Sequence, residues 1–206
     1  MNQRAIAWRL RGLARRVRGF TLTEMLIVVA VAAILAMIAV PSLQGALRNN
    51  RLDTVSNQFV AALAMARSEA VKQGITVTVN NAAGAGSQNW GTGWTICCTP
   101  GGGSTDYLQK GEALLSPMTN YGNAATATGS FQFSSMGRLV GAGNAQELVF
   151  VFCADGATLV NGSRAVLISP SGRVSLAHIA QPGATVGTPG VPLKDDGNPV
   201  ASCTSP

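Results

Sequence analysis

The chain has little charge and lacks the residue patterns of common catalytic and metal sites. Only 12% of its 206 residues are charged and 47% are hydrophobic, which argues against disorder and is low in charge for a cytosolic protein. Its only histidine is His178, and no CxxC pair is present, so a zinc site is not expected. A Gly-x-Ser-x-Gly pattern is absent, and the glycines at 101–103 are not followed by the lysine of a phosphate-binding loop. We therefore expect no enzyme activity, no metal and no cofactor, and a structural role for His178.

Acidic residues are absent ahead of Phe20, where six arginines gather. These are Arg4, Arg9, Arg11, Arg15, Arg16 and Arg18. From Phe20 onward the chain has nine Lys or Arg and nine Asp or Glu, so the net charge of +6 belongs entirely to the N-terminal segment. A basic segment ahead of an apolar run holds the N-terminus in the cytoplasm, so this charge indicates targeting rather than nucleic-acid binding.

A long apolar run follows the basic segment. Residues 25–40 are sixteen apolar residues without a break, and the next charge after Glu24 is Arg48. Residues 25–47 would form a helix of about 35 Å, long enough to cross a bilayer. A cleaved secretory signal would have a shorter run ending at a small-x-small site. Glu24 opens the run, where a carboxylate is costly unless it is solvated at headgroup level or paired with a cation.

The helical pattern continues beyond the apolar run as an amphipathic stripe. Its apolar members are Leu52, Val55, Phe59, Leu63, Ala66 and Ala70. Gly74 is a typical helix stop, so we predict one helix over residues 21–73, apolar all round to residue 47 and amphipathic over 48–73. Pro41 lies inside this helix and marks either a kink or a proline tolerated in a membrane helix.

Residues 74–206 have the alternation of a β-rich domain, and the fold class is therefore α+β. The predicted strands are 75–79, 94–97, 131–133, 147–153, 164–169 and 174–178. Short strands at this spacing indicate an antiparallel sheet or a small β-sandwich. Trp90 and Trp94 are expected in its core. The tail over 181–202 is rich in Pro and Gly.

Residues 18–24, Arg-Gly-Phe-Thr-Leu-Thr-Glu, closely resemble the cleavage and methylation motif of type IV prepilins and type II secretion pseudopilins. The resemblance implies that prepilin peptidase cuts between Gly19 and Phe20 and methylates the new amine of Phe20. It also implies that Glu24 pairs with the Phe20 amine of a neighbouring subunit, because two groups that are each costly in hydrocarbon cost less together. Thr23 departs mildly from the aliphatic residue common there. Pro41 resembles the site where pilin helices bend or melt.

Four further blocks resemble the GspH/FimT family of minor pseudopilins and minor pilins. They are Ala-Arg-Ser-Glu-Ala at 66–70, Gly-Thr-Gly-Trp at 91–94, residues 131–138 ending in Gly-Arg, and Ser-Pro-Ser-Gly-Arg-Val at 169–174. The resemblance implies the pilin lollipop plan, a long helix packed on a β-rich head. The divisions are then a leader at 1–19, a transmembrane and assembly half at 20–47, an amphipathic half at 48–73 and a head at 74–206.

Four cysteines, Cys97, Cys98, Cys153 and Cys203, behind a membrane-targeting segment fit an oxidising compartment such as the periplasm. They allow three pairings. We favour Cys153–Cys203, which brackets the tail, resembles a bridge near the C-terminus of some family members, and would contribute about 4 kcal/mol. Cys97 and Cys98 are adjacent, where a bridge is strained, and one of them pairing with Cys153 or Cys203 stays open.

Some minor pilins of this family bind DNA through a Gly-Arg-x-Arg element. This chain has Gly172-Arg173-Val174-Ser175, without the second arginine, and its side chains after the leader sum to zero charge. Convergence of Arg138, Arg164 and Arg173 would be the remaining route to a phosphate contact. Nucleic acid is therefore not the favoured partner.

The function predicted from the sequence is that of a minor pilin of the type IV pilus, priming assembly at the filament tip. The alternatives are a minor pseudopilin of a type II secretion system and a DNA-binding minor pilin for natural transformation. The implied partners are other minor pilins or pseudopilins, the major pilin and prepilin peptidase. The expected location is the bacterial inner membrane, single pass with the head in the periplasm, and then the filament.

Overall fold

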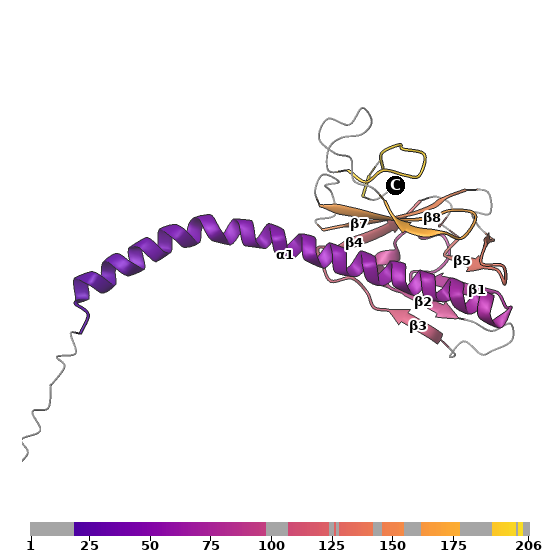
Figure 1. Cartoon of the computed structure of the whole chain (residues 1–206), viewed down its shortest axis with the longest axis horizontal. Helices are drawn as coiled ribbons and strands as arrows, with labels where there is room; N and C mark the ends of the chain where they lie inside the picture. The colour runs from indigo at the N-terminus through magenta and orange to yellow at the C-terminus, as the bar shows by residue number, and fades with distance from the viewer. Residues whose placement is uncertain are drawn as a thin grey trace, which may run out of the picture. The chain divides into compact units, whose positions relative to one another are not determined.

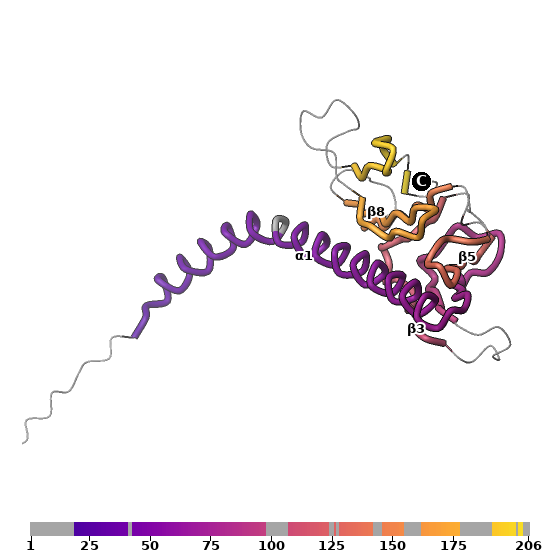
Figure 2. Tube along the Cα trace, turned by 45° about the vertical axis from the view of Figure 1, so that its right-hand side comes forward, coloured from indigo at the N-terminus to yellow at the C-terminus, as the bar shows by residue number. Residues whose placement is uncertain are grey.

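The computed structural model describes most of the chain after residue 18 (Figure 1) (Figure 2). The described residues are 19–97, 107–123, 126, 128–141, 146–154, 162–177, 191–200 and 202–203. Residues 1–18 of the expected leader, Cys98, His178 and much of the tail lie outside them. The chain divides into two compact units, residues 1–43 and 44–206, which are described separately below.

A single helix, α1 (Leu22–Gln73), runs through the boundary between the units. Within the second unit, the apolar stripe predicted from the sequence is the buried face, with Leu52, Phe59, Leu63, Ala66 and Ala70 at most 1% exposed. The helix ends before Gly74, whose backbone has a φ of 68°, the left-handed region that glycine adopts at helix C-termini. The predicted helix over 21–73 is confirmed.

The head consists of two antiparallel sheets (Figure 1). The five-stranded sheet has the order β3-β2-β1-β5-β6, with β1 (Val77–Asn81), β2 (Trp94–Cys97), β3 (Tyr107–Gly111), β5 (Ser130–Phe133) and β6 (Leu139–Val140). The four-stranded sheet has the order β4-β7-β8-β9, with β4 (Thr119–Gly122), β7 (Leu148–Cys153), β8 (Ser163–Ile168) and β9 (Val174–Leu176). A short 3-10 helix, η1 (Trp90–Thr92), precedes β2. The predicted α+β class is confirmed.

One aromatic cluster joins α1 to both sheets. The Phe59 ring of α1 lies 5.6 Å from Trp94 of β2 and 5.1 Å from Phe150 of β7, centroid to centroid. Trp90 is 1% exposed and packs against Phe131 and Phe150. Edge-on aromatic contacts of this kind add to the free energy of burying the rings. The core prediction for Trp90 and Trp94 is confirmed, because Trp94 is partly buried against the same cluster.

Three strands were not predicted. They are β3, β4 and β6: β3 and β4 contain polar residues and glycine, and β6 has only two residues, so their local patterns are weak. The polar β4 is a strand because all four of its residues pair with β7, from Thr119 with Cys153 to Gly122 with Phe150. Among the predicted strands, β1 lies at Val77–Asn81 rather than 75–79, and β9 ends at Leu176 rather than at 178.

Candidate assembly segment and the contacts of the head

The first turn of α1 is capped by the sequence around the predicted assembly residue. Thr21 Oγ1 accepts a hydrogen bond of 3.2 Å from the backbone N–H of Glu24. Thr-x-x-Glu is the pattern of an N-terminal cap, which satisfies a backbone donor that the helix leaves free. Glu24 is the acidic residue of this first turn, next to the positive end of the helix dipole. Our sequence reasoning gave Thr21 no role, although the Thr-x-x-Glu spacing identifies it.

The apolar part of α1 in the first unit is exposed. Phe20 is 69% exposed, and none of the most apolar 18-residue stretch of α1 is buried in the described structure. By length and composition α1 could cross a membrane. It continues as helix through Pro41, for which the kink stays a prediction. An apolar surface of this size on a described helix requires lipid or other subunits to cover it.

Arg67 of α1 connects two turns that come from different sheets. Its Nε donates a 2.8 Å hydrogen bond to the Gly137 carbonyl, in the turn between β5 and β6. Its Nη2 donates a 3.3 Å bond to the Ser171 carbonyl, in the turn between β8 and β9. The blocks at 66–70, 131–138 and 169–174 therefore meet at one guanidinium. Sequence reasoning identified all three blocks but assigned no role to Arg67.

The two turns touch at their glycines. Gly172 has a φ of 78°, and a Cβ at this position would lie 1.9 Å from the Gly137 carbonyl oxygen. Only a residue without a side chain fits such an approach and adopts this backbone conformation without strain. Gly137 and Gly172 are therefore required by the junction of the two sheets.

The three arginines proposed for DNA contact are placed differently. Arg164 Nε lies 2.6 Å from Asp53 Oδ1, an ion pair that ties β8 to α1. Arg173 Nη2 lies 2.6 Å from Asp195 Oδ2. Arg138 is exposed and follows Gly137, in the turn whose carbonyl touches Gly172, the residue before Arg173. Arg164 lies near the start of β8, about 13 Å along the strand from Ile168, the residue that pairs with Val174 beside Arg173.

A second apolar cluster lies on the other face of the four-stranded sheet. It contains Val149, Val151, Cys153, Ala165, Leu167, Val200 and Cys203. Cys153 and Cys203 form a disulfide, the pair that the sequence analysis favoured, with a Cα–Cα distance of 6.0 Å. Cys97 is a free, partly exposed thiol. The described part of the tail thus covers a sheet face that would otherwise expose aliphatic side chains.

A carboxyl group lies beside this tail. Glu147 precedes β7, and its burial raises the pKa of its side chain, to which the nearby negative charges of Asp195 and Asp196 contribute. Asp195 itself pairs with Arg173. Glu147 therefore makes a pH-dependent contribution to the stability of the head.

Two family models match the chain. The model described as type II transport protein GspH matches residues 55–172, more than half of the chain. This chain belongs to the GspH family. A second model, the prokaryotic N-terminal methylation motif, matches residues 14–40. The GspH match contains the Arg67 junction, and the methylation motif contains Gly19, Phe20 and Glu24.

This GspH-family chain is also similar to solved pilin structures. Two crystal forms of the type IV minor pilin FimU from Pseudomonas aeruginosa match it. The first has 27% identity and a TM-score of 0.50, covering 61% of this chain and 91% of FimU. The second has 26% identity and a TM-score of 0.51, and it covers 62% of this chain and 88% of that FimU chain. No curated protein matches the chain.

The family and the FimU likeness together support a minor pilin or minor pseudopilin role. Both kinds of protein are structural components rather than enzymes. The long N-terminal helix followed by antiparallel sheets is the type IV pilin fold.

Proposed function

We propose that the chain is a minor pilin of the type IV pilus that contributes to priming or tip assembly of the filament. The observation that carries this proposal is the likeness to the minor pilin FimU, which extends over 91% of that chain. The methylation motif at 14–40 and the exposed apolar face of α1 support it, because both fit a subunit that passes from the membrane into a filament.

The segments have separate roles in this proposal. Prepilin peptidase removes residues 1–19 by cutting between Gly19 and Phe20, and methylates Phe20. Residues 20–47 then hold the subunit in the inner membrane as a single pass, and residues 74–206 fold in the periplasm on the amphipathic part of α1. During assembly Glu24 pairs with the Phe20 amine of a neighbouring pilin, so two costly groups in an apolar surrounding satisfy each other.

The assembly proposal is tested by two substitutions in the full chain. Gly19→Ala should leave an uncut precursor, and N-terminal sequencing of the unaltered chain should begin at methylated Phe20. Glu24→Ala should be cut and folded, but its amount in sheared filaments, measured by immunoblot, should fall at least about tenfold. The reason is that the Phe20 amine of the neighbouring pilin would be left unpaired in hydrocarbon, which costs several kcal/mol. Glu112→Ala, an exposed carboxyl of the head, is the control. Normal incorporation of Glu24→Ala would reject the pairing.

The second candidate is a minor pseudopilin of a type II secretion system, which the description of the matching GspH model favours. Deleting the gene separates the two. A type IV pilus role predicts loss of surface pili with protein secretion intact, and a pseudopilin role predicts the reverse. Complementation with the full chain should restore whichever activity is lost.

A further inference from the structure

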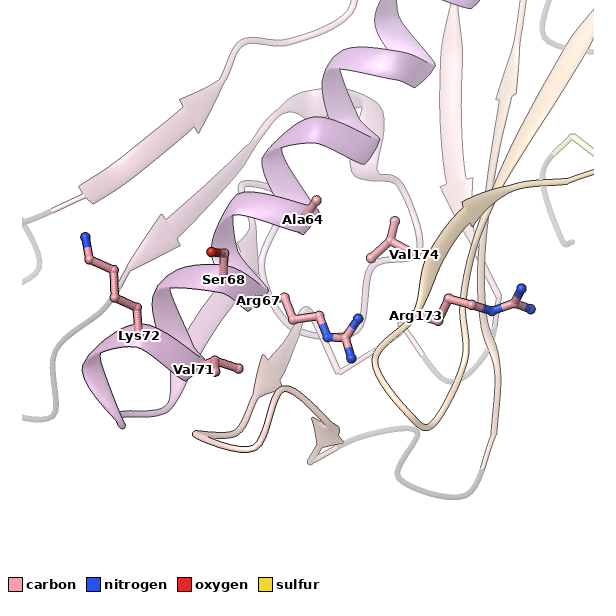
Figure 3. A pocket seen from close by; sticks show the side chains of 7 residues that line it. All are labelled: Ala64, Arg67, Ser68, Val71, Lys72, Arg173 and Val174. Carbon is pink, nitrogen blue, oxygen red and sulfur yellow. The ribbon is translucent and has the colours of Figure 1, made fainter.

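A groove runs along the last two turns of α1, beside the head (Figure 3). It has a volume of about 600 Å³ and lies between α1 and the start of β9. Its lining residues are Ala64, Arg67, Ser68, Val71, Lys72, Arg173 and Val174. Ala64 and Ser68 are small and leave the groove open along the helix, while Val71 is 52% exposed and Val174 gives the opposite wall an apolar side chain.

The groove contains a positive charge that the head does not neutralise. Lys72 lies 3.8 Å from Glu69, and Arg173 pairs with Asp195, its guanidinium directed away from that of Arg67 (Figure 3). Arg67 is partly buried and donates to two neutral carbonyls, and within the described part of the chain it forms no ion pair. A guanidinium has five N–H donors, so Arg67 retains donors for an anion.

We propose that this groove binds an acidic side chain of an adjacent pilin subunit, an Asp or Glu next to an aliphatic residue. A carboxylate would form charge-assisted hydrogen bonds with Arg67, and the aliphatic neighbour would cover Val71 and Val174. The inference rests on the proposed function, which places other subunits beside the head.

The charge also determines the symmetry of the contact. A two-fold contact between two copies of this groove would bring two Arg67 cations together, which is unfavourable. The partner therefore presents a different surface. A contact between unlike surfaces of successive subunits generates rings or open filaments rather than two-fold dimers, and a pilus is an open filament.

The experiment places a photoreactive benzoylphenylalanine at Ala61 of the full chain, an exposed position one helical turn before Ala64 and outside the groove, in cells that assemble the filament. We expect a covalent adduct with another pilin, attached within a few residues of an Asp or Glu, as mass spectrometry would identify.

Val71→Glu places a carboxylate one helical turn from Arg67, where it competes with the partner's carboxylate. Val71→Gln is the matched control, because glutamine has the size of glutamate and a polar side chain without the negative charge. The adduct yield should fall at least about tenfold in Val71→Glu relative to Val71→Gln, the loss of one charge-assisted contact.

Several results would overturn the inference. They are equal adduct yields in the two Val71 variants, no adduct in filaments that contain the chain, and attachment to the same groove of a second copy, to a nucleic acid or to a protein that is not a pilin. Urea unfolding of both variants, which should agree, separates loss of contact from loss of fold. Absence of the unaltered chain from filaments would instead reject the proposed function, so the two failures are distinguishable.

Discussion

At the scale of single residues, the head depends on the junction where Arg67, Gly137 and Gly172 meet. Arg67 reaches the carbonyl of Gly137 and that of Ser171, and the two turns are in van der Waals contact through their glycines. The junction explains why three short blocks, far apart in the chain, occur together in a chain with this fold. Each block supplies one surface of the same contact.

Gly172→Ala tests this junction. Its Cβ would lie 1.9 Å from the Gly137 carbonyl oxygen in addition to requiring a left-handed backbone, so we expect a loss of about 3 to 5 kcal/mol in the free energy of unfolding. Gly197→Ala is the control, because Gly197 has a similar φ of 81° with open space around it, and should cost about 1 to 2 kcal/mol. Urea unfolding followed by fluorescence of the buried Trp90 measures both. Equal losses would contradict the close approach.

Glu147→Gln tests the carboxyl beside the tail. The folded pKa of Glu147 is raised, so the folded state holds its proton more tightly than the unfolded chain, and ionised Glu147 destabilises the fold. The destabilisation by ionised Glu147 grows as pH rises from the ordinary carboxyl pKa of the unfolded chain through the raised pKa of the folded state. Glu147→Gln should therefore increase the free energy of unfolding at pH 7 and lose this advantage near pH 3.5. Glu112→Gln, on the surface beside Lys110, is the comparison, and a gain for Glu147→Gln that is independent of pH would reject the assignment.

At the scale of elements, the four-stranded sheet has both faces covered. One face contributes Leu148, Phe150 and Phe152 to the core under α1, and the other contributes Val149 and Val151 to the cluster under the tail. Every residue of β7 is buried, as its continuous apolar sequence predicts. The described part of the tail, with Val200 and Cys203, therefore forms a third layer on this sheet and is held by the disulfide.

Removal of the disulfide tests the layer. The Cys153→Ser/Cys203→Ser double variant should lose about 4 kcal/mol, the chain-entropy estimate for a separation of 50 residues, and should bind a dye specific for exposed apolar surface. Cys97→Ser replaces the free thiol and should change the free energy of unfolding by less than about 1 kcal/mol. A double variant as stable as the unaltered chain would show that packing alone holds the tail.

At the scale of the whole molecule, the positive excess lies in residues 1–19, the proposed leader. Once residues 1–19 are removed, nine cationic and nine anionic side chains remain, and among them Arg164 and Arg173 are engaged by Asp53 and Asp195. Phosphate binding depends on clustered cations whose counterions are released. Zero net charge and the pairing of Arg164 and Arg173 with carboxylates therefore argue against strong phosphate binding.

A gel-shift titration of the mature chain in detergent should accordingly show no salt-sensitive DNA shift at micromolar protein. A variant that combines Asp53→Asn and Asp195→Asn frees both arginines and is the positive comparison. A shift by the unaltered chain that weakens steeply with salt would favour the DNA-binding alternative.

The sequence by itself determined the features that depend on short-range order. Composition and periods of 3.6 and 2 residues determine four features: the polybasic N-terminal segment, the apolar run from residue 25, the amphipathic stripe from Leu52 to Ala70, and the buried strands β7 and β8. Thr21 also belongs here, because the spacing from Thr21 to Glu24 is local.

Only the tertiary structure decided the contacts between distant segments. The polar β4 is a strand through its pairing with β7, and Arg67 reaches turns 70 and 104 residues away. Arg173 is neutralised by Asp195, 22 residues further along the chain, whereas Arg67 bonds only to neutral carbonyls of distant turns. Which charges are neutralised depends on distances across the fold, and a pattern of neighbouring residues does not contain those distances.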